Sequence, residues 1–179
     1  AESITLDDNT MRGYAKKVRV KAFDRTVLRI PYLPFATSQE RMSGFLEPKI
    51  SYSSDGLDFM IPYYRVLSET SDFTIALRNI SDRGLGFEAN SRNLHGNNNL
   101  RSIDFIYFNN DKEYENIYPS DSDSRWAFSI NDSFGDKKNF WVDVDWSKSS
   151  DSLVLRDIPG DITSIAVSYT HLRAHETNS

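Results

Sequence analysis

The sequence contains no cysteine, which excludes disulfide bonds, a thiolate nucleophile and any metal site built on cysteine. It has no uncharged apolar run near the roughly 18 residues that a membrane-spanning helix requires. It also has no excess of positive charge, because 21 Lys and Arg stand against 26 Asp and Glu. An acidic chain without a basic block is not expected to bind nucleic acid.

Residues that fill helices are scarce as well. Only 9 Ala and 8 Glu occur among the 179 residues, whereas Ser, Asn and Asp together number 54. Ser, Asn and Asp favour turns and helix ends over helix interiors. The composition therefore predicts an all-β protein rich in turns. The chain starts at Ala1 without an initiator Met, so we expect either a removed signal or a piece of a longer protein.

Apolar and polar residues alternate with a period of two along successive short segments, as Phe73, Ile75 and Leu77 illustrate. This pattern predicts an antiparallel meander in which each strand has one apolar and one wet face. A long acidic loop is expected at 110–124. The expected strands are 3–6, 12–23, 26–33, 44–53, 57–66, 72–80, 84–94, 101–109, 125–132, 138–147 and 152–157.

Two kinds of protein fit such alternation. In a soluble β-sandwich, such as a carbohydrate-binding or adhesin-like module, the apolar faces meet each other. In an outer-membrane barrel they meet lipid, and the polar faces line the lumen. The segments are close to the ~9–11 residues of a tilted spanning strand, and aromatic residues crowd the strand ends. These two details favour the barrel.

The candidates for catalysis or metal binding are weak. His171 and His175 have the spacing of a helical zinc site but no third ligand in view. Asp143 and Asp145 share one face of an expected strand, where solvated or lumen-facing carboxylates are a simpler interpretation than a glycosidase pair. No phosphate loop or nucleophile elbow occurs. We therefore expect no enzyme, no cofactor and no metal.

Pro48 and Pro62 fall in the middle of two adjacent expected strands, 44–53 and 57–66. A proline lacks the backbone N–H that a strand ladder uses, so it is normally confined to edges, ends and bulges. Each proline marks either a β-bulge or a strand pair that is deliberately weak.

Five separated strings, in this order, carry a resemblance to a known family. They resemble the LptD family of outer-membrane lipopolysaccharide-assembly proteins over roughly residues 10 to 160. The strings are Val27–Phe35 (VLRIPYLPF), Glu40–Pro48 (ERMSGFLEP), Tyr52–Tyr64 (YSSDGLDFMIPYY), Ser81–Leu85 (SDRGL) and Asp123–Ser129 (DSRWAFS).

The resemblance implies a partial chain with two regions. Residues 1–36 would be the end of a periplasmic β-jellyroll, and 37–167 the N-terminal strands of a large transmembrane β-barrel in the outer membrane. The family inserts lipopolysaccharide into the outer leaflet through a barrel that opens sideways. The implied partners are lipopolysaccharide, a plug lipoprotein, a periplasmic bridge protein and outer-membrane lipid.

The resemblance also gives roles to particular residues. Pro48 and Pro62 become candidates for a weakened lateral gate. Four polar residues become candidates for the lumen wall that faces the sugar part of the cargo: Glu47, Lys49, Asp58 and Arg78. One phase of the alternation is expected to face lipid: Leu46, Ile50, Phe59, Ile61, Phe73, Ile75, Leu77, Phe87, Phe128, Val142 and Val144.

The end of the chain departs from the family pattern. The stretch from Ser168 to Thr177 resembles a string that recurs at the ends of unrelated gene predictions, as if adapter bases had been translated. We expect residues 168–179 to be a foreign tail.

Overall fold

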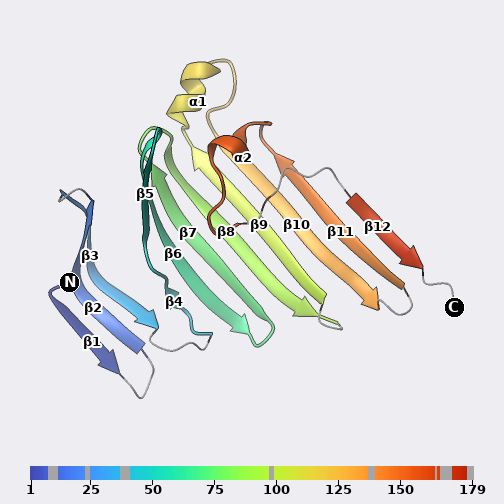
Figure 1. Cartoon of the computed structure of the whole chain (residues 1–179), viewed down its shortest axis with the longest axis horizontal. Coiled ribbons are helices and arrows are strands. Elements are labelled where there is room, and N and C mark those ends of the chain that lie inside the picture. The colour runs from blue at the N-terminus through green and yellow to red at the C-terminus, as the bar shows by residue number, and fades with distance from the viewer. Residues whose placement is uncertain are drawn as a thin grey trace.

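The structure is a computed structural model that describes residues 1–7, 12–22, 25–36, 41–96, 99–136, 140–163, 165 and 171–176. It consists of two antiparallel sheets and two short helices (Figure 1). The predicted all-β, antiparallel architecture is confirmed. No described helix is long and apolar enough to span a membrane.

The first sheet has three strands in sequence order: β1 (Ser3–Asp7), β2 (Arg12–Ala22) and β3 (Arg25–Ala36). The pairing of β2 with β3 shifts register between Val20 and Lys21. The end of β3 lies beside β4 of the second sheet, so the two sheets adjoin at this strand (Figure 1).

The second sheet has nine strands, and its order runs β12-β11-β10-β9-β8-β7-β6-β4, with β5 also paired to β6. Each strand from β6 to β12 pairs with its neighbours in sequence, so the chain forms a simple meander. The strands are β4 (Gly44–Phe45), β5 (Lys49–Ser53), β6 (Gly56–Ser68), β7 (Ser71–Ile80), β8 (Gly84–His95), β9 (Asn99–Asn109), β10 (Arg125–Asp136), β11 (Phe140–Ser149) and β12 (His171–Glu176).

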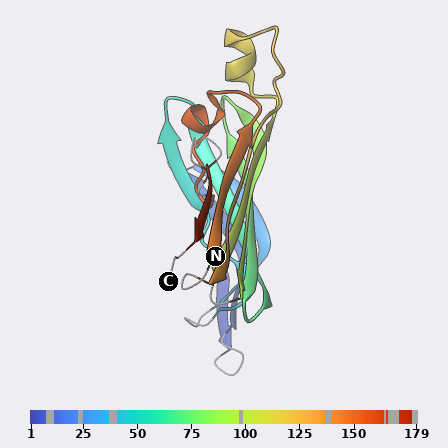
Figure 2. The same ribbon diagram turned by 90° about the vertical axis from the view of Figure 1, so that its right-hand side faces the viewer.

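One face of this sheet is apolar and open. Ile75, Leu77 and Leu85 are among the exposed large side chains on it. We call it the outer face. No second layer of described residues covers it, and α2 and β5 are both on the opposite side of the sheet (Figure 2). An uncovered apolar face does not fit a sandwich, in which two such faces meet.

The inner face holds the buried residues of the sheet. Ile80, Ile106, Phe108 and Ala127 form an apolar cluster there with residues that follow β11. Among the residues expected to face lipid, all but Leu46 lie on the outer face by the observed register. Leu46 lies on the inner face opposite Pro62, because an extra residue follows it in the chain.

Two connections at the long-loop end differ from the sequence prediction. Residues 152–157 form no strand; Val154–Asp157 is the short helix α2. The helix places Val154 and Ile158, four residues apart, together in the apolar cluster, which a strand could not do.

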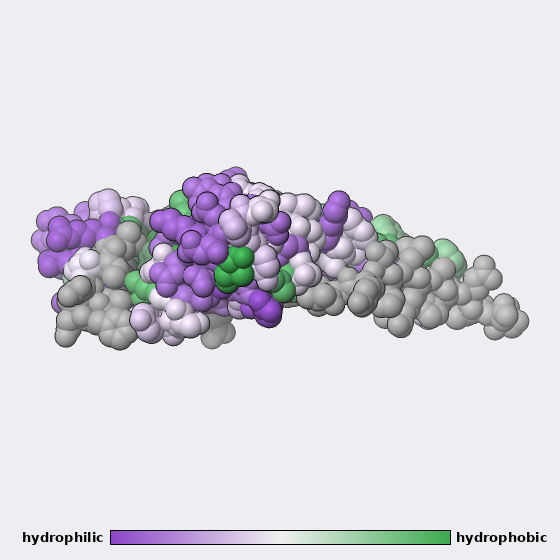
Figure 3. Space-filling view, turned by 90° about the horizontal axis from the view of Figure 1, so that it is seen from above, coloured by the Kyte–Doolittle hydropathy of each residue, from purple (hydrophilic) through white to green (hydrophobic). Residues whose placement is uncertain are grey.

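The acidic loop 110–124 contains another helix, α1 (Lys112–Ile117). Asp111 caps it by accepting a hydrogen bond from the Tyr114 amide at 3.1 Å, and Glu113 and Glu115 suit the positive helix start. Seen from the end that carries α1 and α2, the molecule is mainly hydrophilic (Figure 3).

Strand β12 falls within the predicted foreign tail. Its pairing with β11 runs from Phe140 opposite Glu176 to Asp145 opposite His171. His171 and His175 therefore belong to a strand, not to a helical face that would present both to one metal ion. Residues 166–170 and 177–179 lie outside the described residues.

The contact between Gly86 and Phe108 offers a direct test of the inner-face packing. A Cβ at Gly86 would clash with the Tyr107 carbonyl oxygen and lie 2.5 Å from the Phe108 ring. We expect Gly86→Val to lower the free energy of unfolding by about 1–3 kcal/mol through overpacking. Leu85→Val on the open outer face serves as the control and should change it by less than about 0.5 kcal/mol. The measurement is urea unfolding of the full-length protein in detergent; equal midpoints for the two variants would contradict the packing described.

Candidate functional site at the first strand and the inner face

The first strand of the large sheet is interrupted where the sequence predicted one continuous strand, 44–53. Phe45 lies opposite Tyr63 and Lys49 opposite Met60, so three residues of this strand oppose two of β6. The extra residue makes a β-bulge that includes Pro48 and separates β4 from β5. It also reverses the inward and outward phases of the chain, which is why Leu46 turns to the inner face.

Pro62 occupies a different kind of position. It is buried on the inner face, and the pairing of β6 with β7 passes through it from Asp58 to Val66 without a shift. Its carbonyl oxygen accepts a hydrogen bond from the Leu46 amide at 2.9 Å, so its backbone polar groups face the first strand. The N–H that proline lacks is therefore missing from the pair between β6 and the first strand.

A cluster of charged side chains lies beside this pair on the inner face. The Arg78 guanidinium donates through Nε to Asp58 Oδ1 at 3.0 Å and through Nη2 to Asp58 Oδ2 at 2.6 Å. Its Nη1 donates to Glu88 and to the Pro159 carbonyl oxygen. Arg78 and Glu88 are both buried, so each charge is compensated within the cluster.

Residues 158–162, which we call the inner segment, cross the inner face above this cluster. Ile158 is fully buried in the apolar cluster. Glu88 Oε2 accepts hydrogen bonds from the Asp161 and Ile162 amides at 2.9 and 3.0 Å. Lys49 of β5 forms an ion pair with Asp161 at 2.9 Å. The chain after β11 thus reaches the first hairpin of the large sheet, formed by β5 and β6.

The structure brings three of the four predicted lumen-wall residues together. Asp58 and Arg78 share an ion pair, and Lys49 joins the same surroundings through Asp161. All three therefore have partners within the chain. Glu47 lies apart from them, on the wall of a cavity nearer the first sheet.

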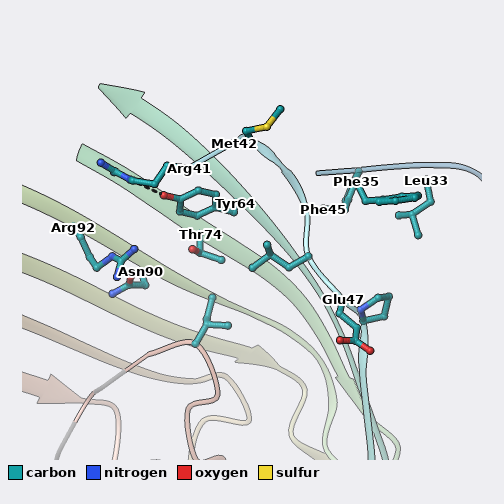
Figure 4. Close-up of a pocket in the computed structure, with 13 residues that line it drawn as sticks. Leu33, Phe35, Arg41, Met42, Phe45, Glu47, Tyr64, Thr74, Asn90 and Arg92 are labelled. Atoms are coloured by element: carbon teal, nitrogen blue, oxygen red, sulfur yellow. Dashed lines mark hydrogen bonds between the residues drawn. The ribbon is translucent and has the colours of Figure 1, made fainter. Parts of the chain in front are cut away.

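That cavity, of about 850 Å³, lies where the two sheets adjoin (Figure 4). Leu33 and Phe35 of β3 border it on one side, and Arg41, Tyr64 and Arg92 lie on the other (Figure 4). One wall is therefore apolar and the other carries cationic and polar groups. Leu46 and Pro48 of the bulge also line it.

Arg41, which shortly precedes β4, is bonded to the second sheet. Its Nη2 donates to Asp72 Oδ2 at 2.7 Å, and its Nε to the Tyr64 hydroxyl oxygen at 3.2 Å. Asp72 also accepts from Arg92 Nε at 2.9 Å. A nearly buried carboxylate thus holds two partly exposed arginines at the cavity wall.

A second ionic cluster fixes the start of the chain that leads to the inner segment. Arg125, which is fully buried, pairs with Asp111, Asp151 and Asp157 at 2.9, 2.7 and 3.1 Å. Burial raises the pKa of Asp151, but hydrogen bonds from Arg125, Ser150 and the Leu153 amide outweigh it and lower that pKa overall. The Arg125 guanidinium also stacks 4.1 Å from the Tyr114 ring centroid, which links α1 to the same cluster.

Sequence reasoning missed Glu88, Asp161 and the pair of His95 with Asp132. Glu88 and Asp161 are far apart in the chain and share no motif, so no local signal marks them. His95 Nε2 lies 2.7 Å from Asp132 Oδ1, and Arg101 pairs with the other oxygen. Asp143, a candidate for a glycosidase pair by sequence, accepts hydrogen bonds from Ser133 and Trp141. Within the described part of the chain, no group of three or more His, Asp or Glu is placed to hold a metal ion.

Comparison with known proteins finds several relatives that carry the same name. No family model matches the chain. The LPS-assembly protein LptD of Acinetobacter baylyi is 32% identical over 88% of this chain and 19% of its own length. The protein of the same name from Legionella pneumophila is 30% identical over 92% of this chain and 21% of its own length. That from Pseudomonas aeruginosa is 27% identical over 96% of this chain and 18% of its own length.

These matches extend over most of the chain, and their names agree with the family that the five strings predicted. The chain spans about a fifth of the length of these curated relatives. The chain belongs to the LPS-assembly protein LptD family.

Proposed function

We propose that this chain is part of an outer-membrane protein that delivers lipopolysaccharide to the outer leaflet, and that the first strand of its large sheet forms the release seam. The observation that carries the proposal is the combination of the bulge at Pro48 with the missing N–H of Pro62. Both weaken the attachment of the same strand to β6. A strand that must separate to release a lipid needs such an attachment.

The faces of the sheet support a place in the membrane. The outer face offers apolar side chains to its surroundings without a covering layer. The inner face carries compensated charges and polar groups, as expected for a lumen wall. In this assignment the first sheet, β1 to β3, lies in the periplasm, and the cavity where the sheets adjoin lies on the route of the lipid.

The proposal includes the partners that the family resemblance implies. Lipopolysaccharide is the cargo, a periplasmic bridge protein supplies it to the first sheet, and a plug lipoprotein fills the lumen of the complete barrel. Of the predicted lumen residues, Glu47 borders the cavity and is the candidate for cargo contact. Lys49, Asp58 and Arg78 hold the wall in shape. We propose no catalytic step.

The membrane assignment predicts that charge on the outer face is costly according to depth. Leu77 lies within β7, whereas Leu85 lies at the start of β8, and both side chains are exposed on the same face. Leu77→Arg should destabilise the full-length protein in lipid by about 2–4 kcal/mol, and Leu85→Arg by about 1 kcal/mol or less. Unfolding of the protein reconstituted in vesicles measures both. Equal small effects would fit a water-facing surface and contradict the assignment.

The seam predicts that restoring amide donors slows release. In the double variant Pro48→Ala and Pro62→Ala, the new N–H at position 62 faces the first strand and adds a ladder bond worth about 0.5–1.5 kcal/mol. Lipopolysaccharide delivery should fall and sensitivity to large hydrophobic antibiotics should rise, while the barrel still folds. Pro119→Ala in the exposed loop after α1 is the matched control. Unchanged delivery by a correctly folded double variant would show that these prolines do not form the release seam.

A further inference from the structure

The inner segment connects parts of the sheet that do not otherwise touch. It starts from the cluster around Arg125, where Asp157 is paired, and continues as Ile158 in the apolar core. Its backbone then reaches Glu88 of β8, and its Asp161 side chain reaches Lys49 of β5. A single stretch of chain therefore ties β10, β8 and β5 together across the inner face.

Glu88 is the fixed end of this connection. One of its carboxylate oxygens accepts both the Asp161 and the Ile162 amides, while the other pairs with Arg78. The residue is completely buried. A buried carboxylate that is bonded through both oxygens in this way is costly to disrupt, because the remaining charges and amides would be left without partners.

The first hairpin, β5 with β6, lies at the other end of this connection. All five residues of β5 are exposed, and β5 pairs only with β6 among the described strands. Three ion pairs restrain the hairpin: Lys49 with Asp161, Asp58 of β6 with Arg78, and Asp55 of its turn with Arg83. Arg78 in turn donates to the Pro159 carbonyl oxygen, so the first two restraints converge on the inner segment.

The inner segment leaves little room for a side chain at Gly160. A Cβ there would clash with Thr163 Oγ1 and would lie 3.1 Å from the Thr163 carbonyl oxygen and 3.2 Å from Ile106 Cδ1. A larger residue at this position must therefore displace the backbone around it. This gives a way to displace the segment without touching any charged group.

We propose that the inner segment is a latch that holds the first hairpin, β5 with β6, against the inner face and so controls how freely the first strand separates. Glu88 and Asp161 are positioning residues: Glu88 fixes the segment, and Asp161 carries its hold to Lys49. As regulation of the release seam this inference rests on the proposed function, whereas the mechanical link can be measured without any cargo.

The test is hydrogen exchange of the full-length protein in detergent micelles, followed in peptides that cover residues 49–57. Asp161→Asn removes the ion pair with Lys49. It leaves unchanged the sequence of the hairpin and the hydrogen bond from the amide of residue 161 to Glu88. It should speed exchange in these peptides by about two- to fivefold. Glu88→Ala and Gly160→Val release the whole segment and should speed it by about tenfold or more. Glu113→Gln on α1 removes the same charge elsewhere and should leave exchange unchanged.

Each outcome bears on the latch. Faster exchange of the hairpin in Asp161→Asn and Gly160→Val, with Glu113→Gln unchanged, supports it. Unchanged exchange in Asp161→Asn overturns it, and this variant alters a partly exposed side chain, so the fold survives to be measured.

Lipopolysaccharide delivery, measured in cells for the same variants, separates the latch from the proposed function. If exchange rises while delivery is unaffected, the regulatory role of the latch is overturned. If the proline double variant also leaves delivery unchanged, the seam itself fails, and the exchange result still decides the mechanical link.

Discussion

A proline has no amide hydrogen, and the strength of this sheet at its first strand depends on which strand pair that absence affects. Pro62 lies in unbroken register with β7, and its carbonyl oxygen is turned toward Leu46. The missing donor therefore weakens the attachment of the first strand, not the body of the sheet. The bulge at Pro48 adds to the same weakness. Within lipid, where water cannot replace a lost hydrogen bond, such a pair is the place where a sheet opens most easily.

The inner face offsets this weakness with charge. Arg78, Glu88 and Asp58 form a buried cluster whose members compensate one another, and the inner segment joins it through backbone groups. Ionic clusters of this kind contribute little net stability but fix geometry, because any single loss leaves a buried charge unpaired. The backbone hydrogen bonding of the first strand to β6 is weak, but the ion pairs of the inner face thus keep the hairpin in a defined position.

The alternation of apolar and polar residues sufficed to predict the strands, the meander and the outer face, because a period of two follows directly from strand geometry. The prediction was wrong at Leu46, because one extra residue in the first strand reverses which side chains face inward. Nothing in the local sequence shows how many residues of one strand lie opposite its partner. The prediction was also wrong at 152–157, where four-residue spacing of Val154 and Ile158 was hidden in a short apolar stretch. Contacts such as Glu88 with Asp161 depend on how distant segments cross, and the sequence carries no motif for them.

We expect the first strand to be the most weakly held strand of the described sheet. Residue-resolved hydrogen exchange of the unaltered full-length protein in lipid vesicles tests it most directly. Amides of Ile50–Ser53 should exchange at least about tenfold faster than those of Thr74–Arg78 in β7, which is paired on both sides. Equal protection of the two strands would contradict it.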